Sequence, residues 1–379
     1  MLFFCLEAMK NLLHLHIVKI NKYKQMKNEY YVLGLMSGTS LDGLDLALCH
    51  FVKTDVWNYK VIAANTVEYT DDLREKLANT LTLSAYEFAM LDVELGKYFA
   101  AKINAFLANQ NLIPDFIASH GHSTFHQPHI GLAVQIGKGA IIATQTGITT
   151  VCDFRTTDVA LGGQGAPLVP IGDELLFAQY DACLNLGGIS NISFNIDGKR
   201  LAFDISPCNM ALNYLANKLD LKYDKDGENA RKGNIDFKLL DKLNDIDFYK
   251  KTGAKSLGKE WFDTVFLPCM EASEISVYDK LRTITEHIAI QLHKVLPFKH
   301  NNAKILVTGG GARNMFLIER ISEISQQTII IPDGETIDFK EAIVFAFLGV
   351  LRMRGEINCL KNVTGATVDS CGGCVYMGR

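Results

Sequence analysis

Apolar and polar positions along the first half of the chain predict alternating strands and helices. Runs of apolar and β-branched residues predict strands at 30–36, 44–51, 61–69, 116–119, 132–136 and 148–152. Apolar residues recur at helical spacing over 73–81 and 85–108, and 140–146 is a further predicted helix. The polar stretch 120–129 follows one of these strands and is predicted to be a loop.

The second half of the chain repeats this arrangement. Its predicted strands cover 182–186, 192–196, 201–204 and 304–308, and its predicted helices cover 207–219, 279–296, 314–324 and 341–354. Asp279 is predicted to cap the second of these helices, and Pro297 marks its end. Each half opens with two strands joined by a glycine-rich turn, which indicates an internally duplicated α/β unit.

Chain length and charge narrow the class of protein. A chain of 379 residues exceeds what one hydrophobic core supports, so two domains are expected. The apolar share of 48% and the charged share of 21% are ordinary for a cytosolic globular protein. The formal net charge of -4 argues against a nucleic-acid-binding protein, which normally carries a basic excess. An anionic nucleotide would therefore be held by backbone amides, helix ends and metal ions.

Nine cysteines are scattered irregularly, and most are expected to be buried thiols of a reducing compartment, the cytoplasm. Cys371 and Cys374 form the one pair with metal-like or redox-like spacing. A structural zinc site needs two further ligands, and the sequence offers no second close pair. The alternative for this pair is a flexible tail with two free thiols.

Residues 1–28 are expected to form an extension outside the folded core. A signal peptide would need a basic start, a longer apolar run and a small-residue cleavage site. A membrane span needs about 20 apolar residues, and Glu7 and Lys10 interrupt the apolar stretch here. No membrane partner is therefore expected, and Met26 is an alternative start of the protein.

The first glycine-rich turn has the composition of a phosphate-binding loop. Gly38 and Gly43 allow backbone amides to approach an anion closely, and the Thr39–Ser40 pair adds hydroxyl donors. Asp42 and Asp45 suit a divalent cation that lies between carboxylate and phosphate. The alternative is an ordinary Asp-Gly hairpin turn.

Two further glycine turns favour the phosphate-binding interpretation. The hairpin turn at 185–191 would let two facing hairpins clamp a phosphate chain from both sides. The turn at 309–311 follows a predicted strand and precedes a predicted helix, which is the context for a nucleotide at a helix N-terminus. A dinucleotide fingerprint with Asp333 as ribose ligand is the alternative. Asn314 stands where its last glycine belongs, and too little chain follows to build that fold.

Histidines gather at one place in the chain, namely at His120, His122, His126 and His129. Their spacing allows a metal site, but no carboxylate or thiol is close in sequence to complete one.

Taken together, the turns resemble those of the superfamily of acetate and sugar kinases and actin. More closely, the longer motifs are similar to those of the anhydro-N-acetylmuramic acid kinase family, in the family's order from about residue 31 to the end. They lie at 35–45, 152–155, 162–170, 185–188, 308–311 and 363–366. The resemblance implies two duplicated ribonuclease-H-like (actin-like ATPase) domains around an interdomain cleft. It places 29–151 and about 365–379 in the first domain, and 152–364 with a helical insertion in the second.

The resemblance also implies a reaction. Members are ATP-dependent sugar kinases that open the internal bridge of 1,6-anhydro-N-acetylmuramic acid with water and phosphorylate O6, giving N-acetylmuramic acid 6-phosphate in peptidoglycan recycling. The implied ATP-binding residues are Gly38, Thr39, Ser40, Leu41, Asp42, Gly43, Leu44, Asp45, Gly187, Gly188, Gly309, Gly310, Gly311 and Asn314. Mg²⁺ is implied with the nucleotide, held by Asp42 and Asp45, directly or through water.

Two carboxylates are implied at the sugar. Asp204 is implied as the base that deprotonates the attacking water, stabilised by the N-terminus of the helix that follows it. Without the resemblance, Asp204 is predicted to be a helix cap. Glu341 is implied to contact the sugar, whereas by itself it is a first-turn glutamate favoured by the helix dipole.

Three further residues are implied in the sugar pocket. Arg155 either holds the lactyl carboxylate through two hydrogen bonds or pairs with a neighbouring aspartate, Asp153 or Asp158. His122 and Ser123 stand where the family has Gln and Thr, and both side chains can hydrogen-bond a sugar hydroxyl.

The departures from the family pattern lie near the sugar rather than near the nucleotide. They are His122 and Ser123, the pair Thr156 and Thr157 after Arg155, and Ile205 and Ser206 with Cys208. A kinase for another amino or anhydro sugar is therefore an alternative, as is a non-catalytic nucleotide-binding sensor of the same fold. Sugar and ATP are the expected partners, and the family implies a homodimer.

Overall fold

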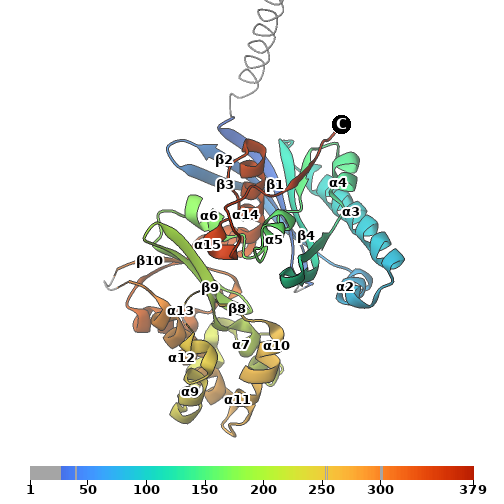
Figure 1. Cartoon of the computed structure of the whole chain (residues 1–379). Coiled ribbons are helices and arrows are strands. Elements are labelled where there is room, and N and C mark those ends of the chain that lie inside the picture. The colour runs from blue at the N-terminus through green and yellow to red at the C-terminus, as the bar shows by residue number, and fades with distance from the viewer. Residues whose placement is uncertain (1–26, 39–40, 252, 254, 299–301) are drawn as a thin grey trace, which may run out of the picture.

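The computed structural model describes residues 27–38, 41–251, 253, 255–298 and 302–379. The predicted extension at 1–28, including Met26, lies almost entirely outside the described residues, as do Thr39 and Ser40. In the described ranges the chain forms two β-sheets, one above the other in Figure 1, with helices around each. None of the helices in these ranges is long and apolar enough to cross a membrane.

The first sheet combines an antiparallel meander with parallel strands, in the order β12-β6-β4-β1-β2-β3, and β5 pairs with β4. β1, β2 and β3 are antiparallel neighbours, whereas β4 and β6 run parallel to β1. Its strands are β1 (Glu29–Ser37), β2 (Gly43–Lys53), β3 (Trp57–Glu68), β4 (Phe116–Gln127), β5 (Leu132–Ile136), β6 (Thr150–Cys152) and β12 (Cys374–Tyr376).

The second sheet repeats the core of the first. Its order is β11-β10-β7-β8-β9, in which β7, β8 and β9 form an antiparallel meander and β10 and β11 follow in parallel. Its strands are β7 (Ala182–Leu186), β8 (Ile189–Ile196), β9 (Lys199–Pro207), β10 (Lys304–Thr308) and β11 (Thr328–Ile330). The same strand order in both sheets confirms the predicted internal duplication.

Helices cover both faces of the first sheet. One face packs on α2 (Asp71–Ala78), α3 (Ala85–Leu107) and α4 (Gly139–Thr146), and the other on α6 (Pro170–Leu175) and α14 (Gly334–Arg354). Short helices α5 (Thr156–Ala160) and α15 (Lys361–Thr364) lie in the connecting segments.

The second sheet carries a larger helical layer, seen in the lower part of Figure 1. These helices share one hydrophobic core with the sheet. They are α7 (Asn209–Asn217), α8 (Glu228–Lys232), α9 (Phe237–Asn244), α10 (Lys259–Trp261), α11 (Leu267–Glu271), α12 (Val277–Val295) and α13 (Met315–Ser325). α12 begins after Ser276, whose side chain accepts from the backbone N–H of Asp279, so the predicted cap at Asp279 is wrong by three residues.

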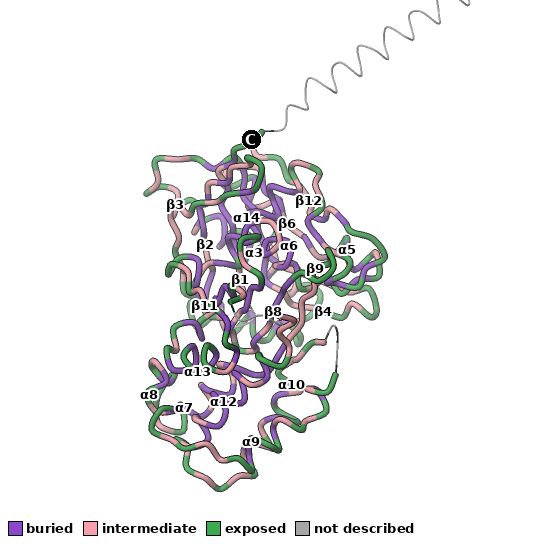
Figure 2. Tube along the Cα trace, turned by 90° about the vertical axis from the view of Figure 1, so that its left-hand side faces the viewer, coloured by how far each residue is buried: buried purple, intermediate pink, exposed green. Residues whose placement is uncertain are grey.

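α14 packs on the first sheet and is enclosed over much of its length. Every residue from 342 to 351 is buried, and Figure 2 shows buried residues concentrated along α14 and the strands beside it. Helices that are apolar all round are typical of a protein interior. Gly34 of β1 permits this approach, because a Cβ there would overlap the backbone oxygen of Ala342 and lie 2.9 Å from Cβ of Ala346.

The position of α14 bears on the domain boundaries. α14 contacts β1, β2 and β4, and α6 shares the same core, although both helices fall in the stretch 152–364 that the sequence assigned to the second domain. On this packing we propose that α6 and α14 belong to the first domain.

Two polar segments are more regular than predicted. The stretch 120–129 is not a loop, because β4 continues to Gln127 and pairs with β5. α14 begins at Gly334, capped by Asp333, so Glu341 lies inside the helix rather than in its first turn. In both cases backbone hydrogen bonds extend an element through polar residues that pattern alone assigned elsewhere.

The C-terminal segment is part of the first sheet, so the predicted flexible tail is wrong. β12 pairs antiparallel with β6, and Cys374 lies directly opposite Cys152. All eight cysteines in the described ranges are free thiols.

We predict that Gly34→Ala destabilises the protein strongly. The added methyl group must displace the backbone of α14, so the free energy of unfolding should fall by about 3 kcal/mol, the upper end of overpacking costs. Urea unfolding monitored by circular dichroism measures this change.

The matched control is Gly334→Ala at the start of the same helix. There the nearest heavy atom to an added Cβ is 3.7 Å away, so stability should be unchanged or slightly raised. Equal losses in the two variants would contradict the proposed importance of the contact between β1 and α14.

Candidate active site

A buried histidine and an arginine form the first part of the site. His120 lies on β4, just before a bend at Gly121, where φ is 74°. Its Nδ1 donates to the carbonyl of Gly121 at 2.8 Å, and its Nε2 accepts from Nη2 of Arg155 at 2.8 Å and from Nε at 3.2 Å. Burial, with Arg155 next in effect, lowers the pKa of His120 well below its ordinary value. His120 is therefore a neutral acceptor that orients the guanidinium.

Arg155 does not pair with either neighbouring aspartate. Its Nη1 donates to the carbonyl of Gly165 at 2.5 Å. Asp158 accepts instead from the backbone N–H of Gly165 at 2.7 Å and from the hydroxyl of Thr364 at 2.7 Å. Because these bonds use only part of the guanidinium, N–H groups of Arg155 remain for a ligand.

Glu341 is the negative neighbour of Arg155. The side chain is exposed to solvent, yet enough protein surrounds it that desolvation raises the pKa of its carboxyl, with Arg155 opposing this and Asp45 adding to it. Glu341 on α14 and Arg155 in the segment after β6 are therefore electrostatically coupled.

Asp45 extends the same group of charges. It lies on β2, and one carboxylate oxygen accepts from the hydroxyl of Thr66 at 2.6 Å. Burial raises the pKa of Asp45 despite this bond, and the charges of Asp338 and Asp42 raise it further. Several carboxylates that repel one another favour a bound cation.

No preformed cluster of three or more His, Cys, Asp or Glu side chains suited to a metal occurs in the described ranges. Mg²⁺ typically binds one or two carboxylates together with substrate phosphates and water. Asp42 and Asp45 therefore fit a metal that arrives with a nucleotide, and they do not form a permanent cage.

The two predicted sugar ligands on β4 differ in exposure. His122 is buried, and its Nδ1 lies 2.9 Å from the hydroxyl of Ser37, which itself accepts from Tyr69 at 2.6 Å. Burial lowers the pKa of His122 to about 4. His122 is therefore neutral, and its ring shares one hydrogen bond with the hydroxyl of Ser37. Ser123 is half-buried and pairs with Gln135 of β5.

The structure brings the second and third glycine turns together. Gly309 has φ of 79°, and a Cβ there would lie 2.5 Å from Oδ1 of Asn185 and 2.9 Å from the backbone of Leu186. A Cβ at Gly311 would lie 2.6 Å from Cβ of Leu186 and 3.2 Å from Oδ1 of Asn209. These glycines are needed because the two turns pack backbone against backbone.

Other residues that are predicted to bind the nucleotide also make hydrogen bonds that stabilise turns and helix ends. The carbonyls of Gly187 and Gly188 accept from the backbone N–H groups of Asn209 and Met210, at the start of α7. Asn314 caps α13 through the N–H of Leu317. In the first turn, Leu41 adopts φ of 60°, and its N–H donates to the carbonyl of Gly38.

Asp204 lies inside β9, five residues before α7 begins. Oδ2 of its carboxylate accepts from the backbone N–H of Leu257 at 2.8 Å. The 255–257 segment thus supplies a donor to this anion, and the stabilisation by the N-terminus of α7 stays a prediction. Burial raises the pKa of Asp204, and the bond from Leu257 lowers it in part.

Electrostatic coupling joins Asp45, Arg155 and Glu341 in one group on the first sheet and α14, whereas Asp204 and the two packed glycine turns belong to the second sheet. Sequence reasoning missed the roles of His120 and Asp338. The alternation of His120 and His122 with small residues could have signalled a strand rather than a loop.

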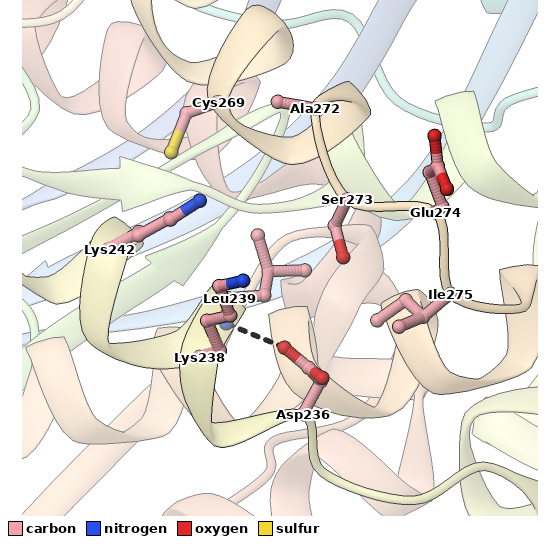
Figure 3. Close-up of a pocket in the computed structure, with 9 residues that line it drawn as sticks. All are labelled: Asp236, Lys238, Leu239, Lys242, Cys269, Ala272, Ser273, Glu274 and Ile275. Atoms are coloured by element: carbon pink, nitrogen blue, oxygen red, sulfur yellow. Dashed lines mark hydrogen bonds between the residues drawn. The ribbon is translucent and has the colours of Figure 1, made fainter.

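A separate hollow of about 430 Å³ lies in the helical layer of the second sheet, and Figure 3 shows the residues that line it. Lys238 and Lys242 of α9, Cys269 of α11 and Glu274 contribute to its walls. None of the predicted site residues lines it.

Comparisons with known proteins agree with the motifs. The model of the family described as anhydro-N-acetylmuramic acid kinase matches residues 30–378. An anhydro-N-acetylmuramic acid kinase of a Sulfurovum species is 35% identical over 371 residues, covering 93% of this chain and 100% of that protein. One from Synechococcus elongatus is 35% identical over 380 residues, covering 91% and 99%.

A solved structure, the (R)-2-hydroxyglutaryl-CoA dehydratase component A of Acidaminococcus fermentans, shares 13% identity at a TM-score of 0.45, covering 86% of this chain and 100% of that one. This likeness is too weak to carry an argument.

Two sheets with the same strand order, each with a glycine turn between its first two strands, define an α/β protein with the duplicated ribonuclease-H-like fold of actin-like ATPases. The family match over nearly the whole length narrows this class. The chain belongs to the anhydro-N-acetylmuramic acid kinase family.

We predict that Gly309→Ala weakens ATP binding at least tenfold. The new methyl group would force apart the two packed turns, which are both predicted to contact the nucleotide. Calorimetric titration with ATP measures the dissociation constant.

Gly198→Ala is the matched control, because Gly198 has a similar φ of 72° but nothing within 4 Å of an added Cβ. Alanine is strained at both positive-φ positions, and more so at Gly309, whose ψ of 165° lies in a region that is essentially restricted to glycine. Only Gly309→Ala should lose affinity. Equal affinities would argue against a nucleotide at these turns.

Proposed function

We propose that this protein is an ATP-dependent sugar kinase that hydrolytically opens 1,6-anhydro-N-acetylmuramic acid and phosphorylates O6, in the recycling of peptidoglycan. The observation that carries this proposal is the family match across residues 30–378. The coupled charges of Arg155 and Glu341 support it. ATP would lie in a cleft between the two sheets.

In the proposed reaction, Asp204 removes a proton from a water molecule while the water oxygen attacks the anomeric carbon. The bond from that carbon to O6 breaks, O6 takes the γ-phosphoryl group, and ADP leaves. A base needs a carboxylate that is reachable and has a pKa near the working range. Asp204 is only half-buried, and its pKa is raised by burial, which fits the role.

The nucleotide phosphates would be held by the turn at 38–45 and the two packed turns at 187–188 and 309–311. Asp42 and Asp45 would hold Mg²⁺, which supplies neutralising charge to the phosphates. Backbone amides at glycines can approach an anion without side-chain obstruction.

Arg155 would hold the lactyl carboxylate of the sugar. His120 and Gly165 fix the guanidinium, and the free N–H groups suit a carboxylate held through two hydrogen bonds. Glu341, His122 and Ser123 would contact the sugar.

A cytoplasmic location is supported by the eight free cysteines of the described ranges, as expected in a reducing compartment. A homodimer is proposed from the family alone.

The decisive test uses purified 1,6-anhydro-N-acetylmuramic acid and ATP, with ADP release and the mass of the sugar product as readouts. Asp204→Asn should lower kcat by a factor of about 100–10,000, the usual contribution of a general base. Because the base acts as a carboxylate, the wild-type rate should fall as pH drops through the raised pKa of Asp204.

The control is Asp245→Asn, at an exposed aspartate beyond α9, which should leave kcat unchanged. If the wild type releases ADP only with another sugar, the substrate is wrong. If ATP binds and no sugar is turned over, the protein is a sensor.

We predict that Arg155→Lys removes the preference of the enzyme for a sugar that carries the lactyl carboxylate. Lysine keeps the charge but cannot form the planar pair of hydrogen bonds, so KM for the lactyl-bearing sugar should rise about 10- to 100-fold. The comparison substrate is 1,6-anhydro-N-acetylglucosamine, which lacks the lactyl group. An unchanged ratio of kcat/KM for the two sugars would contradict this role.

A further inference from the structure

Three ionised side chains are buried together where α6 and α14 meet the second sheet. They are Asp173 of α6, Lys340 of α14 and Arg200 of β9, with exposed fractions of 4%, 6% and 3%. Nζ of Lys340 lies 2.7 Å from Oδ1 of Asp173. The carboxylate of Asp173 is the single negative group among these three.

Ser193 of β8 completes the connection to the second sheet. Its hydroxyl donates to Oδ2 of Asp173 at 2.5 Å. Nη2 of Arg200 donates to the same hydroxyl at 2.7 Å and lies 3.8 Å from Oδ2. One carboxylate thus joins α14 on one side to β8 and β9 on the other.

A contribution to stability does not by itself explain why these charged side chains are buried together. Taking ions out of water is costly, and well-packed apolar side chains of similar volume often stabilise a fold as well or better. Fixing one arrangement among several is the best-attested use of buried charges. The question is which arrangement this group fixes.

Two of these residues lie close in the chain to proposed active-site carboxylates. Lys340 directly precedes Glu341 on α14, and Arg200 lies four residues before Asp204 on β9. The buried charges therefore tie together the two elements that carry the proposed sugar-contacting carboxylates. No recorded hydrogen bond or ion pair links Glu341 and Asp204 directly within the described residues.

We propose that Asp173 is a positioning residue that holds α14 against β9, so that Glu341 and Asp204 keep the separation the sugar reaction requires. This inference rests on the proposed function. Asp173 does not touch substrate, and it acts through Lys340 on one side and through Ser193 and Arg200 on the other.

The charges predict how each variant behaves. Asp173→Asn leaves two cations in a buried site without their counter-charge, which is destabilising. The triple variant Asp173→Leu/Lys340→Met/Arg200→Met removes all three charges, so no buried ion is left without a partner and folding should persist.

The experiment measures kcat, KM for ATP and the melting temperature of both variants with the anhydro sugar. A misplacement of about 1 Å can cost about 100-fold in rate, so kcat should fall by about that factor. KM for ATP should stay within a factor of about three, because the glycine turns are untouched. A merely structural role would lower kcat only as far as the folded fraction falls.

The matched control is Glu286→Gln, which breaks an ion pair inside the second sheet's helical layer. Glu286 of α12 accepts from Nη2 and Nε of Arg320 on α13, at 2.8 and 2.9 Å. This variant should lose stability and keep its kcat, since the pair does not link the two sheets.

A folded triple variant with wild-type kcat would overturn the inference, even if Asp173→Asn fails to fold. A fall in kcat equal to that of Glu286→Gln at the same folded fraction would also overturn it. A wild type that does not turn over the sugar would instead refute the proposed function, and calorimetric ATP binding by the same variants keeps the two failures distinguishable.

Discussion

The close packing of α14 on β1 is the constraint on which the rest of the structure depends. Gly34 lets the backbone of the helix approach the strand at Ala342, and the helix is enclosed from 342 to 351. Interiors packed to crystal-like density leave such a helix little freedom to turn or slide. Its rotation therefore decides which side chains reach the site and which reach the second sheet.

Neighbouring residues of α14 show the consequence. Successive positions on a helix point about 100° apart, so Lys340 is buried against Asp173 while Glu341 is exposed beside Arg155. The same helix presents Asp338 toward Asp45. One rigid helix thus positions charged side chains beside the first sheet. Through Asp173 it also contacts the strand that carries Asp204.

Strands with continuous apolar runs were predictable to the residue, as β5, β7 and β10 show. The bounds of elements that contain many polar residues could not be predicted in this way. β4 extends through His122 because pairing with β5 satisfies its backbone, whatever the side chains are. The start of α14 is polar in sequence, so the helix was placed seven residues late, and Glu341 was wrongly assigned to its first turn.

The sequence by itself determined the duplicated α/β plan, the family and the three glycine turns. Turns and long motifs depend on residues that are consecutive in the chain, so they can be recognised without the tertiary structure. Only the tertiary structure decided the partners of the chemical groups. Arg155 bonds to His120 rather than to Asp153 or Asp158, and Leu257 donates to Asp204. These contacts join residues far apart in the chain, and their distances depend on how the sheets and α14 pack together.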